Sequence, residues 1–110
     1  MAYSQGDVVL VNFNPAKGEE IAKVRPAILI SRDDQNIELD VVIVVPLSSK
    51  VIKGMEPFRI FIPKREGLEK DSDALVYHLR AISKKRIAQK IAGLRKEEIA
   101  QIKEAICEVI

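Results

Sequence analysis

The sequence predicts a mainly β fold of the α+β class: a small, strongly bent sheet or barrel of short antiparallel strands, closed by a C-terminal helix. Two observations support this prediction. Short apolar runs rich in Val and Ile alternate with turn residues over most of the chain. Residues 96–110 instead carry apolar side chains at helical spacing. With 110 residues, the chain is expected to form a single domain spanning residues 1–110.

The first three predicted strands are apolar segments bounded by turn residues. Residues 7–13 form the first strand, and the turn-forming residues 14–18 follow it. Residues 25–31 form the second, in which Pro26 must lie at the start or on an edge because proline has no N–H to donate. Residues 39–45 form the third, and their nearly continuous Val and Ile predict burial on both faces.

The second half of the chain predicts three more strands and then the helix. The strands are residues 58–62, residues 74–79 and, after a turn capped by Ser83, a short strand within residues 87–94. One face of the helix is apolar, with side chains at the spacing of successive helical turns: Ile99, Ile102, Ile106 and Val109. Two acidic residues in its first turn, Glu97 and Glu98, complement the helix dipole.

Composition and charge exclude several classes of protein. The one cysteine, Cys107, permits no disulfide within the chain and no cysteine metal cluster, and its place in an apolar helix predicts a core position. The first residues lack the basic start and apolar run of a signal peptide. The longest apolar stretch, Val41–Val45, is far shorter than the about 20 residues of a membrane span. We therefore expect a soluble, cytoplasmic protein without membrane contact.

The sequence lacks the residues that most classes of enzyme need for their chemistry. A catalytic zinc site typically needs several His ligands, and the chain has one His. A two-metal nuclease needs converging carboxylates, but the tight acidic pairs at residues 33–34 and 71–73 lie in polar segments typical of turns. No glycine-rich phosphate loop is present. The net charge of +2 is only weak evidence for a polyanionic partner. We expect no metal and no cofactor.

Two polar residues stand where a site could be built. Arg25 lies at a strand entrance that Pro26 makes rigid, and its guanidinium can bind a phosphate through two hydrogen bonds. Ser48 follows the long apolar strand, so its hydroxyl would stand near a strand end. Taken alone, each residue also has an ordinary interpretation, Arg25 as a surface ion-pair partner and Ser48 as a turn former.

The same segments carry a resemblance to the MazF/PemK toxins that runs essentially from end to end. Its blocks occur in the order and spacing of that family: GDVV at 6–9, residues 18–30 with RPAILI at 25–30, PLSS at 46–49, and DALVYHLRAI at 73–82 followed by KRI at 85–87. Each motif is short, but the ordered set is specific. We therefore identify the sequence as similar to this family, in its MazF branch.

The resemblance implies an SH3-like barrel related to that of CcdB, assembled as a homodimer. It implies an endoribonuclease toxin, an mRNA interferase, that cleaves single-stranded RNA at short sequences without a metal. The ribose 2′-hydroxyl would attack the adjacent phosphorus and leave a 2′,3′-cyclic phosphate and a 5′-hydroxyl. The implied protein partner is a cognate antitoxin whose disordered tail folds along the toxin groove.

The resemblance also assigns residues to roles. Arg25 matches the family's conserved arginine, which would bind the developing charge, and Ser48 matches the Ser/Thr that would hydrogen-bond the scissile phosphate. Glu20 lies five residues before Arg25, as a glutamate does in some members, and is the candidate proton acceptor or loop anchor. Predicted RNA contacts come from Lys17, Lys23, Ser49, Lys50, Lys53 and His78.

The chain departs from the family at one block. The PemK branch has an Arg-x-Asp pair where this chain has Leu75, Val76 and Tyr77, so the acid–base scheme of that branch cannot be transferred. His78 lies one or two residues from the missing pair. It is either an RNA contact or a partly exposed strand histidine.

Two non-enzymatic alternatives remain. CcdB-type toxins share the fold but bind DNA gyrase through a surface that includes a Trp near the C-terminus, and this chain has no Trp. An SH3-like interaction module would need an aromatic-lined peptide groove, which is hard to build from three Phe and two Tyr.

Overall fold

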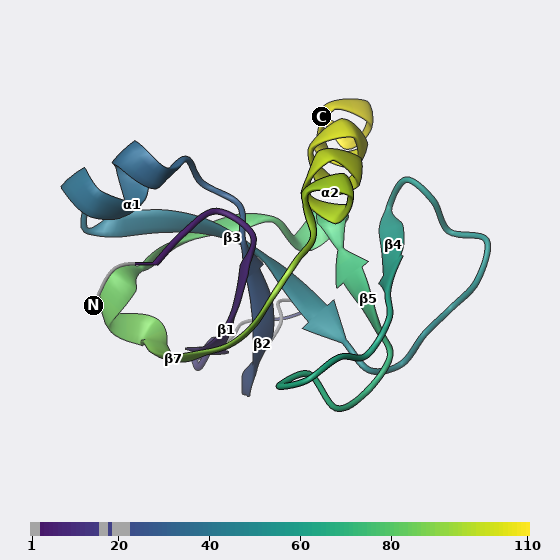
Figure 1. Ribbon diagram of the computed structural model, residues 1–110, viewed down its shortest axis with the longest axis horizontal. Coiled ribbons are helices and arrows are strands. Elements are labelled where there is room, and N and C mark those ends of the chain that lie inside the picture. Colours follow the sequence, from purple (N-terminus) through teal and green to yellow (C-terminus); the bar gives the residue numbers. More distant parts are fainter. Residues whose placement is uncertain (1–2, 16–17, 19–22) are drawn as a thin grey trace.

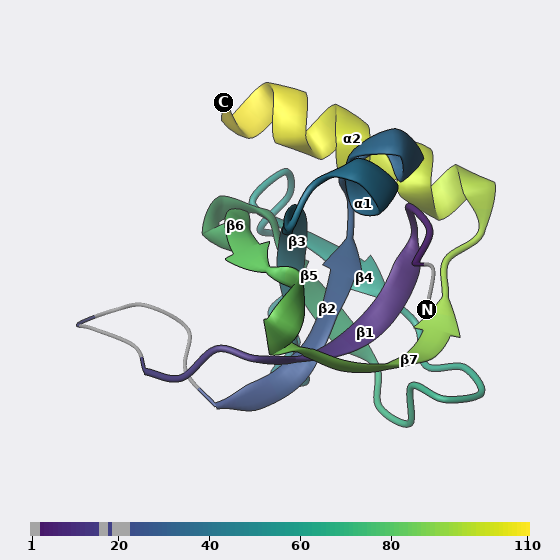
Figure 2. The ribbon, with the colours of Figure 1, turned by 90° about the vertical axis from the view of Figure 1, so that its left-hand side faces the viewer.

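The computed structural model of the protein describes residues 3–15, 18 and 23–110. Strands make up most of the fold, and a short and a long helix cover it at one end (Figures 1 and 2). The elements in chain order are β1 (Asp7–Asn12), β2 (Val24–Leu29), α1 (Asp33–Glu38), β3 (Val41–Ser48), β4 (Arg59–Ile62), β5 (Ser72–Leu75), η1 (Val76–His78), β6 (Arg80–Ser83), η2 (Lys84–Arg86), β7 (Ile87–Gly93) and α2 (Lys96–Val109). No helix of the described ranges has the length and apolar character needed to cross a membrane.

All strand pairs in the described part of the chain are antiparallel and belong to one seven-stranded sheet. The order along the sheet is β4-β5-β3-β2-β1-β7, with β6 beside β3. Figure 1 shows β4 and β5 on one side and β1, β2 and β7 on the other, with β3 passing between them. The outermost strands β4 and β7 do not pair, so the predicted bent sheet is confirmed in its open form rather than as a closed barrel.

β3 belongs to both halves of the sheet. Its residues Val41–Val44 pair with β6, whereas Leu47 and Ser48 pair with β5. Pro46 lies between these two pairings. Here the chain between β5 and β6 forms the η1 turn, so no strand pairs with β3 on this side. A proline is tolerated at this corner because the position needs no ladder N–H on that side.

The central strands are buried on both faces, as predicted for the third strand. One core, here called the strand cluster, consists of Val9, Val11, Phe13, Ala27, Leu29, Val42, Val44 and Ile82. The other, here called the helix cluster, lies under α2 and contains Val8, Ile28, Val45, Leu47 and Ile102 among others. Successive residues of β1, β2 and β3 alternate between the two clusters, because strand side chains point to opposite faces in turn.

The C-terminal helix packs as its apolar stripe predicts. Ile102 is completely buried in the helix cluster, and Ile99, Ile106 and Val109 pack against it. The expectation that Cys107 is a core residue is wrong, since its side chain is exposed. Position 107 is rotated about 100° from Ile106, away from the buried stripe.

Three further elements differ from the sequence prediction. Residues 33–38 form a short helix rather than a turn, and the buried Asn36 anchors it through hydrogen bonds with Ser31. The strand predicted at 74–79 ends at Leu75, continues as η1 and is followed by the unpredicted strand β6. Pro26 lies inside β2, but before the first residue of β2 that pairs with β3. The turn capped by Ser83 is confirmed, because the Ser83 hydroxyl accepts a hydrogen bond from the Lys85 N–H.

Candidate functional site

Arg25 of β2 and Ser48 of β3 lie just beyond the paired part of these two strands. Ala27 of β2 is opposite Pro46 of β3, and continuing this antiparallel register by two residues brings Arg25 opposite Ser48. On the other side of β3, Ser48 is opposite Asp73 of β5, which in turn is opposite Phe61 of β4. A row of four residues, Arg25–Ser48–Asp73–Phe61, therefore crosses four adjacent strands on one face.

This row lies on the face of the strand cluster. Arg25 is two residues from Ala27, and Ser48 is four residues from Val44, and both of these apolar residues belong to that cluster. Val11, directly opposite Arg25 in β1, belongs to it as well. The Arg25 side chain thus stands at the end of an apolar core, where water access is reduced and a phosphate contact is stronger than in bulk water.

Next to this row, Arg59 and Asp73 form a nearly buried ion pair. Their side chains are 12% and 3% exposed, and Arg59 Nη1 lies 3.1 Å from Asp73 Oδ2. The same carboxylate oxygen accepts the Ile52 N–H at 2.9 Å, and Arg59 also donates to the Lys50 carbonyl at 3.0 Å. The pair therefore fixes the segment between β3 and β4. Burial lowers the pKa of Arg59, but its hydrogen bonds to Asp73 and Tyr77 outweigh this and raise it, so the guanidinium stays charged.

His78 ends the η1 turn close to two of these arginines. Its ring is half-buried and lies 4.7 Å from the Tyr77 ring, centroid to centroid. Burial lowers the pKa of His78 below 6.5, and the positive charges of Arg25 and Arg59 lower it further. The imidazole is therefore neutral at neutral pH.

Two cavities lie near the end of β3, one lined by its last residues and one by the segment that follows it. The larger, about 580 Å³, has an apolar lining from Leu47, Leu68 and Ile91, which belong to or pack on the helix cluster, so it opens on that face. Arg25 and Ser48 border it, together with Lys23, Ser49 and Lys50. The second, about 430 Å³, is lined by Asp73 and Phe61 of the row and by Lys53, Arg59 and the segment before β4. Arg25 and Ser48 therefore border the larger cavity, whereas Asp73 and Phe61 border the smaller one.

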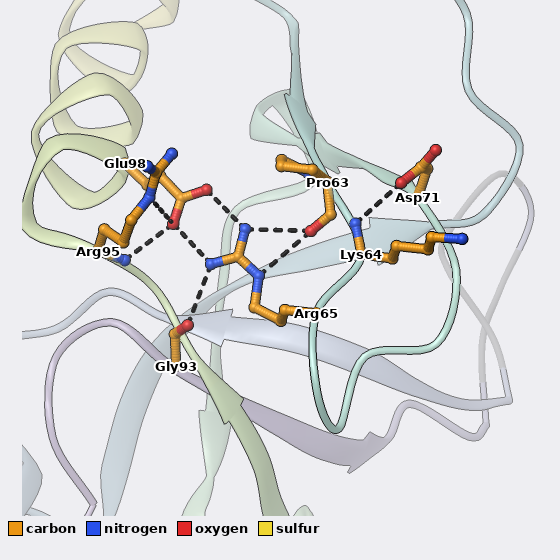
Figure 3. Close-up of polar contacts among 7 residues, drawn as sticks. All are labelled: Pro63, Lys64, Arg65, Asp71, Gly93, Arg95 and Glu98. Carbon is orange, nitrogen blue, oxygen red and sulfur yellow. Dashed lines mark hydrogen bonds and ion pairs between the residues drawn. The ribbon is translucent and has the colours of Figure 1, made fainter.

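The outer wall of the larger cavity is a loop held against α2 and β7 (Figure 3). Arg65 donates to both carboxylate oxygens of Glu98 and to the carbonyls of Gly93 and Pro63. Glu98 also accepts the Arg95 N–H at 2.8 Å, which caps the helix. Gly67, with φ of +90°, packs so closely on β7 that a side chain there would overlap the Ile91 carbonyl.

The structure brings together most, but not all, of the residues singled out in the sequence. Arg25, Ser48, Lys23, Ser49 and Lys50 border the same cavity, while Lys53 borders the second one. The positive charge of Arg25 acts on His78. Glu20 and Lys17 lie outside the described residues. Within the described ranges, no three His, Cys, Asp or Glu side chains group as a metal site would require.

Sequence reasoning missed the Arg59–Asp73 pair and the aromatic residues beside it. Asp73 was interpreted as a turn residue, yet it is 2% exposed and lies inside β5. The available signal was the alternation of residues 59–62, in which Arg59 and Phe61 share one face of a strand. Phe61 and Tyr77 are large side chains that remain about half exposed, at 49% and 48%.

A comparison with models of protein families shows which family the chain belongs to. A family model described as "PemK-like, MazF-like toxin of type II toxin-antitoxin system" matches residues 4–110. The chain belongs to this toxin family. The match spans nearly the whole sequence, so it includes the row at Arg25 and Ser48 as well as the C-terminal helix.

Solved structures of family members share the fold. MazF from Deinococcus radiodurans has 24% sequence identity and a TM-score of 0.84, with 99% of this chain and 96% of that chain covered. The Mycobacterium tuberculosis toxin MazF-mt6 has 19% identity and a TM-score of 0.77, with 93% of each chain covered. A mycobacterial endoribonuclease in complex with its cognate antitoxin has 13% identity and a TM-score of 0.73, with 97% of this chain and 91% of that chain covered.

Proposed function

We propose that this member of the MazF/PemK family is a sequence-specific, metal-independent endoribonuclease toxin that cleaves single-stranded RNA. The observation that carries the proposal is that Arg25 and Ser48 line the same cavity, in a chain that belongs to this toxin family. A related protein of the same fold is described as an endoribonuclease bound to its cognate antitoxin, which supports the activity class.

In the proposed reaction, the ribose 2′-hydroxyl attacks the adjacent phosphorus and the bond to the 5′-oxygen breaks. The products are a 2′,3′-cyclic phosphate and a 5′-hydroxyl. Arg25 stabilises the negative charge that develops on the phosphorane. The Ser48 oxygen accepts a hydrogen bond from the Lys50 N–H at 3.2 Å, which leaves the hydroxyl proton available for a phosphate oxygen.

The RNA backbone follows the basic residues around this pair. Lys23 and Lys50 border the larger cavity and Lys53 the smaller one, so their ammonium groups can neutralise phosphates on both sides of the scissile bond. Ser49 and His78 add polar contacts, and Lys17 and Glu20 belong to the same proposed site by their place in the sequence.

We also propose that the toxin works in the cytoplasm as a homodimer and is inhibited by a cognate antitoxin. The solved complex of a mycobacterial relative with its antitoxin supports this partner. The antitoxin segment would be disordered before binding and fold along the basic groove.

The decisive experiment is cleavage of a long single-stranded RNA in excess EDTA by the purified protein and by Arg25→Ala. Discrete cuts with 5′-hydroxyl ends are expected for the wild type. Loss of a charge-stabilising donor should slow Arg25→Ala by at least about 100-fold. Intact RNA across varied sequences would contradict the proposal and direct attention to gyrase binding, which a supercoiling assay measures. Wild-type rates in a folded Arg25→Ala variant would contradict only the site.

A further inference from the structure

Among the residues that the structure describes, one carboxylate borders the larger cavity. It belongs to Glu69, in the loop between β4 and β5, and it shares this cavity with Arg25 and Ser48. The other charged side chains that border the cavity are all cationic: Lys23, Arg25, Lys50 and Lys70. A carboxylate repels the phosphates that these cations attract, so Glu69 is suited to a different part of the RNA.

The loop holds its chain on both sides of Glu69. Before this residue, Leu68 is 4% exposed and exchanges two backbone hydrogen bonds of 2.9 Å with Arg65, which is itself bound to α2 (Figure 3). After it, the Lys70 carbonyl accepts the Ser72 hydroxyl at 3.0 Å. The Glu69 side chain is exposed. A held backbone therefore presents an accessible carboxylate at the cavity, which lowers the cost of ordering it around a ligand.

The remainder of the cavity suits a nucleobase. Its volume of about 580 Å³ lies within the about 300–1,000 Å³ of ligand-binding clefts. The half-buried side chains of Leu10 and Ile91 contribute apolar lining, which can cover the face of a flat base while polar groups bind its edge. Because Arg25 and Ser48 border the same cavity, the base would belong to a nucleotide that flanks the scissile phosphate.

Guanine is the base whose edge matches a carboxylate. Its Watson–Crick edge presents two adjacent donors, N1–H and the N2 amino group, and the two oxygens of a carboxylate can accept both. Adenine and cytosine each present one amino group beside a ring nitrogen whose lone pair would face the second oxygen. Uracil presents one N–H between two carbonyl oxygens. Each of these bases therefore leaves a carboxylate oxygen unpaired, which a site built for two hydrogen bonds penalises.

We propose that Glu69 binds the Watson–Crick edge of a guanine next to the cut and thereby determines sequence preference, an inference that rests on the proposed ribonuclease function. The two tasks at the cavity are divided between charges of opposite sign. The cations bind phosphates of any sequence, and the carboxylate selects the base.

The test begins with the cut sites that the wild type makes in a long single-stranded RNA, which should share a guanine at one fixed position beside the cut. Short RNAs that differ only at this position then give kcat/KM for each base. Adenine should lower kcat/KM by about 5- to 150-fold, as expected for the loss of a bidentate base contact. Inosine, which lacks only the N2 amino group, should lower it by about 10-fold, because one hydrogen bond to a charged group is lost.

Glu69→Gln should remove this preference. An amide has one acceptor and one donor, and every base offers an adjacent donor and acceptor on its Watson–Crick edge. The variant should therefore cleave the guanine, inosine and adenine RNAs at similar kcat/KM. Glu66→Gln is the matched control, since Glu66 is exposed in the same loop and does not border the cavity, and it should keep the wild-type preference.

The outcomes separate this inference from the function on which it rests. If the cut sites share no guanine, or if Glu69→Gln keeps the full inosine penalty, the inference is overturned and the ribonuclease function stands. Loss of cleavage on every RNA by a Glu69→Gln variant that melts like the wild type also overturns it, because Glu69 would then act in the chemistry rather than in base selection. If the wild type cuts no RNA at all, the proposed function fails and the inference fails with it.

Discussion

The guanidinium of Arg65 donates two hydrogen bonds to the carboxylate of Glu98, one from each Nη atom and both 2.6 Å long. The two residues come from the loop after β4 and from the first turn of α2, and their side chains are 20% and 6% exposed. Glu98 thus has a second role besides complementing the helix dipole. It joins the helix N-terminus to the loop that walls the larger cavity (Figure 3).

Replacing Glu98 with Gln should destabilise the protein by about 3 kcal/mol, because Arg65 would keep a nearly buried charge without its partner. Urea denaturation measures this free energy of unfolding. Glu97→Gln is the matched control, since Glu97 is exposed in the same helical turn and should cost less than about 1 kcal/mol. Equal losses in the two variants would contradict the role assigned to the ion pair.

The same carboxylate predicts how stability depends on acid. The hydrogen bond from Arg65 lowers the pKa of Glu98 from 4.5 to about 2 in the folded state. Its contribution to stability is therefore complete above pH 4.5 and is lost as the pH falls towards about 2. The wild type should lose about 3 kcal/mol more than Glu98→Gln over this range, because one pKa unit corresponds to about 1.4 kcal/mol. Parallel stability curves for the two proteins would refute the assignment.

Asp73→Asn should also be strongly destabilising, by about 3 kcal/mol, since it removes the anion that Arg59 faces at a nearly buried site. The loss of this charge should loosen residues 49–58, because the carboxylate also accepts the Ile52 N–H. Hydrogen exchange of the Ile52 amide measures the local effect. Asp71→Asn is the control: Asp71 is exposed and accepts one hydrogen bond from Lys64, so its replacement should cost about 1 kcal/mol or less.

Ser48→Ala should slow RNA cleavage by about 100-fold with little change in KM, because the hydroxyl is proposed to act on the charge of the transition state. Ser49→Ala should have a smaller effect, mainly on KM. Ser49 is exposed and lies just after the last residue of β3. Single-turnover rates of both variants on the mapped RNA test this, and a larger loss in kcat for Ser49→Ala would reverse the assignment.

The sequence was sufficient to predict the strands and the helix that bury apolar stripes. Ile99, Ile102 and Ile106 show their periodicity directly, and the Val and Ile of β3 show burial on both faces. The elements that it did not predict are held by contacts distant in sequence or by polar groups. α1 has no apolar periodicity and depends on the buried Asn36, and β6 contains one buried apolar residue, Ile82, and forms by pairing with β3.

The candidate site was predictable from the sequence only where local motifs carry it. Arg25 and Ser48 were singled out through ordered motifs, and in the structure they border the same cavity. The link between Arg59 and Asp73 depends on the pairing of β4 with β5, so the alternation of residues 59–62 indicates the face on which Arg59 lies but not its partner. The position of His78 depends on η1, where a turn replaces the predicted continuation of a strand.

β1 pairs with β7, although the two strands are far apart in the sequence. Val8 lies opposite Ala92, so the first strand is held in the sheet by a segment that is synthesised much later. Contacts this distant in sequence form slowly, because a long loop must close first. A nascent chain that ends before β7 leaves the outer edge of β1 unpaired next to Arg25 and β2. For a protein proposed to cut RNA, this topology delays assembly of the complete sheet until β7 has been translated.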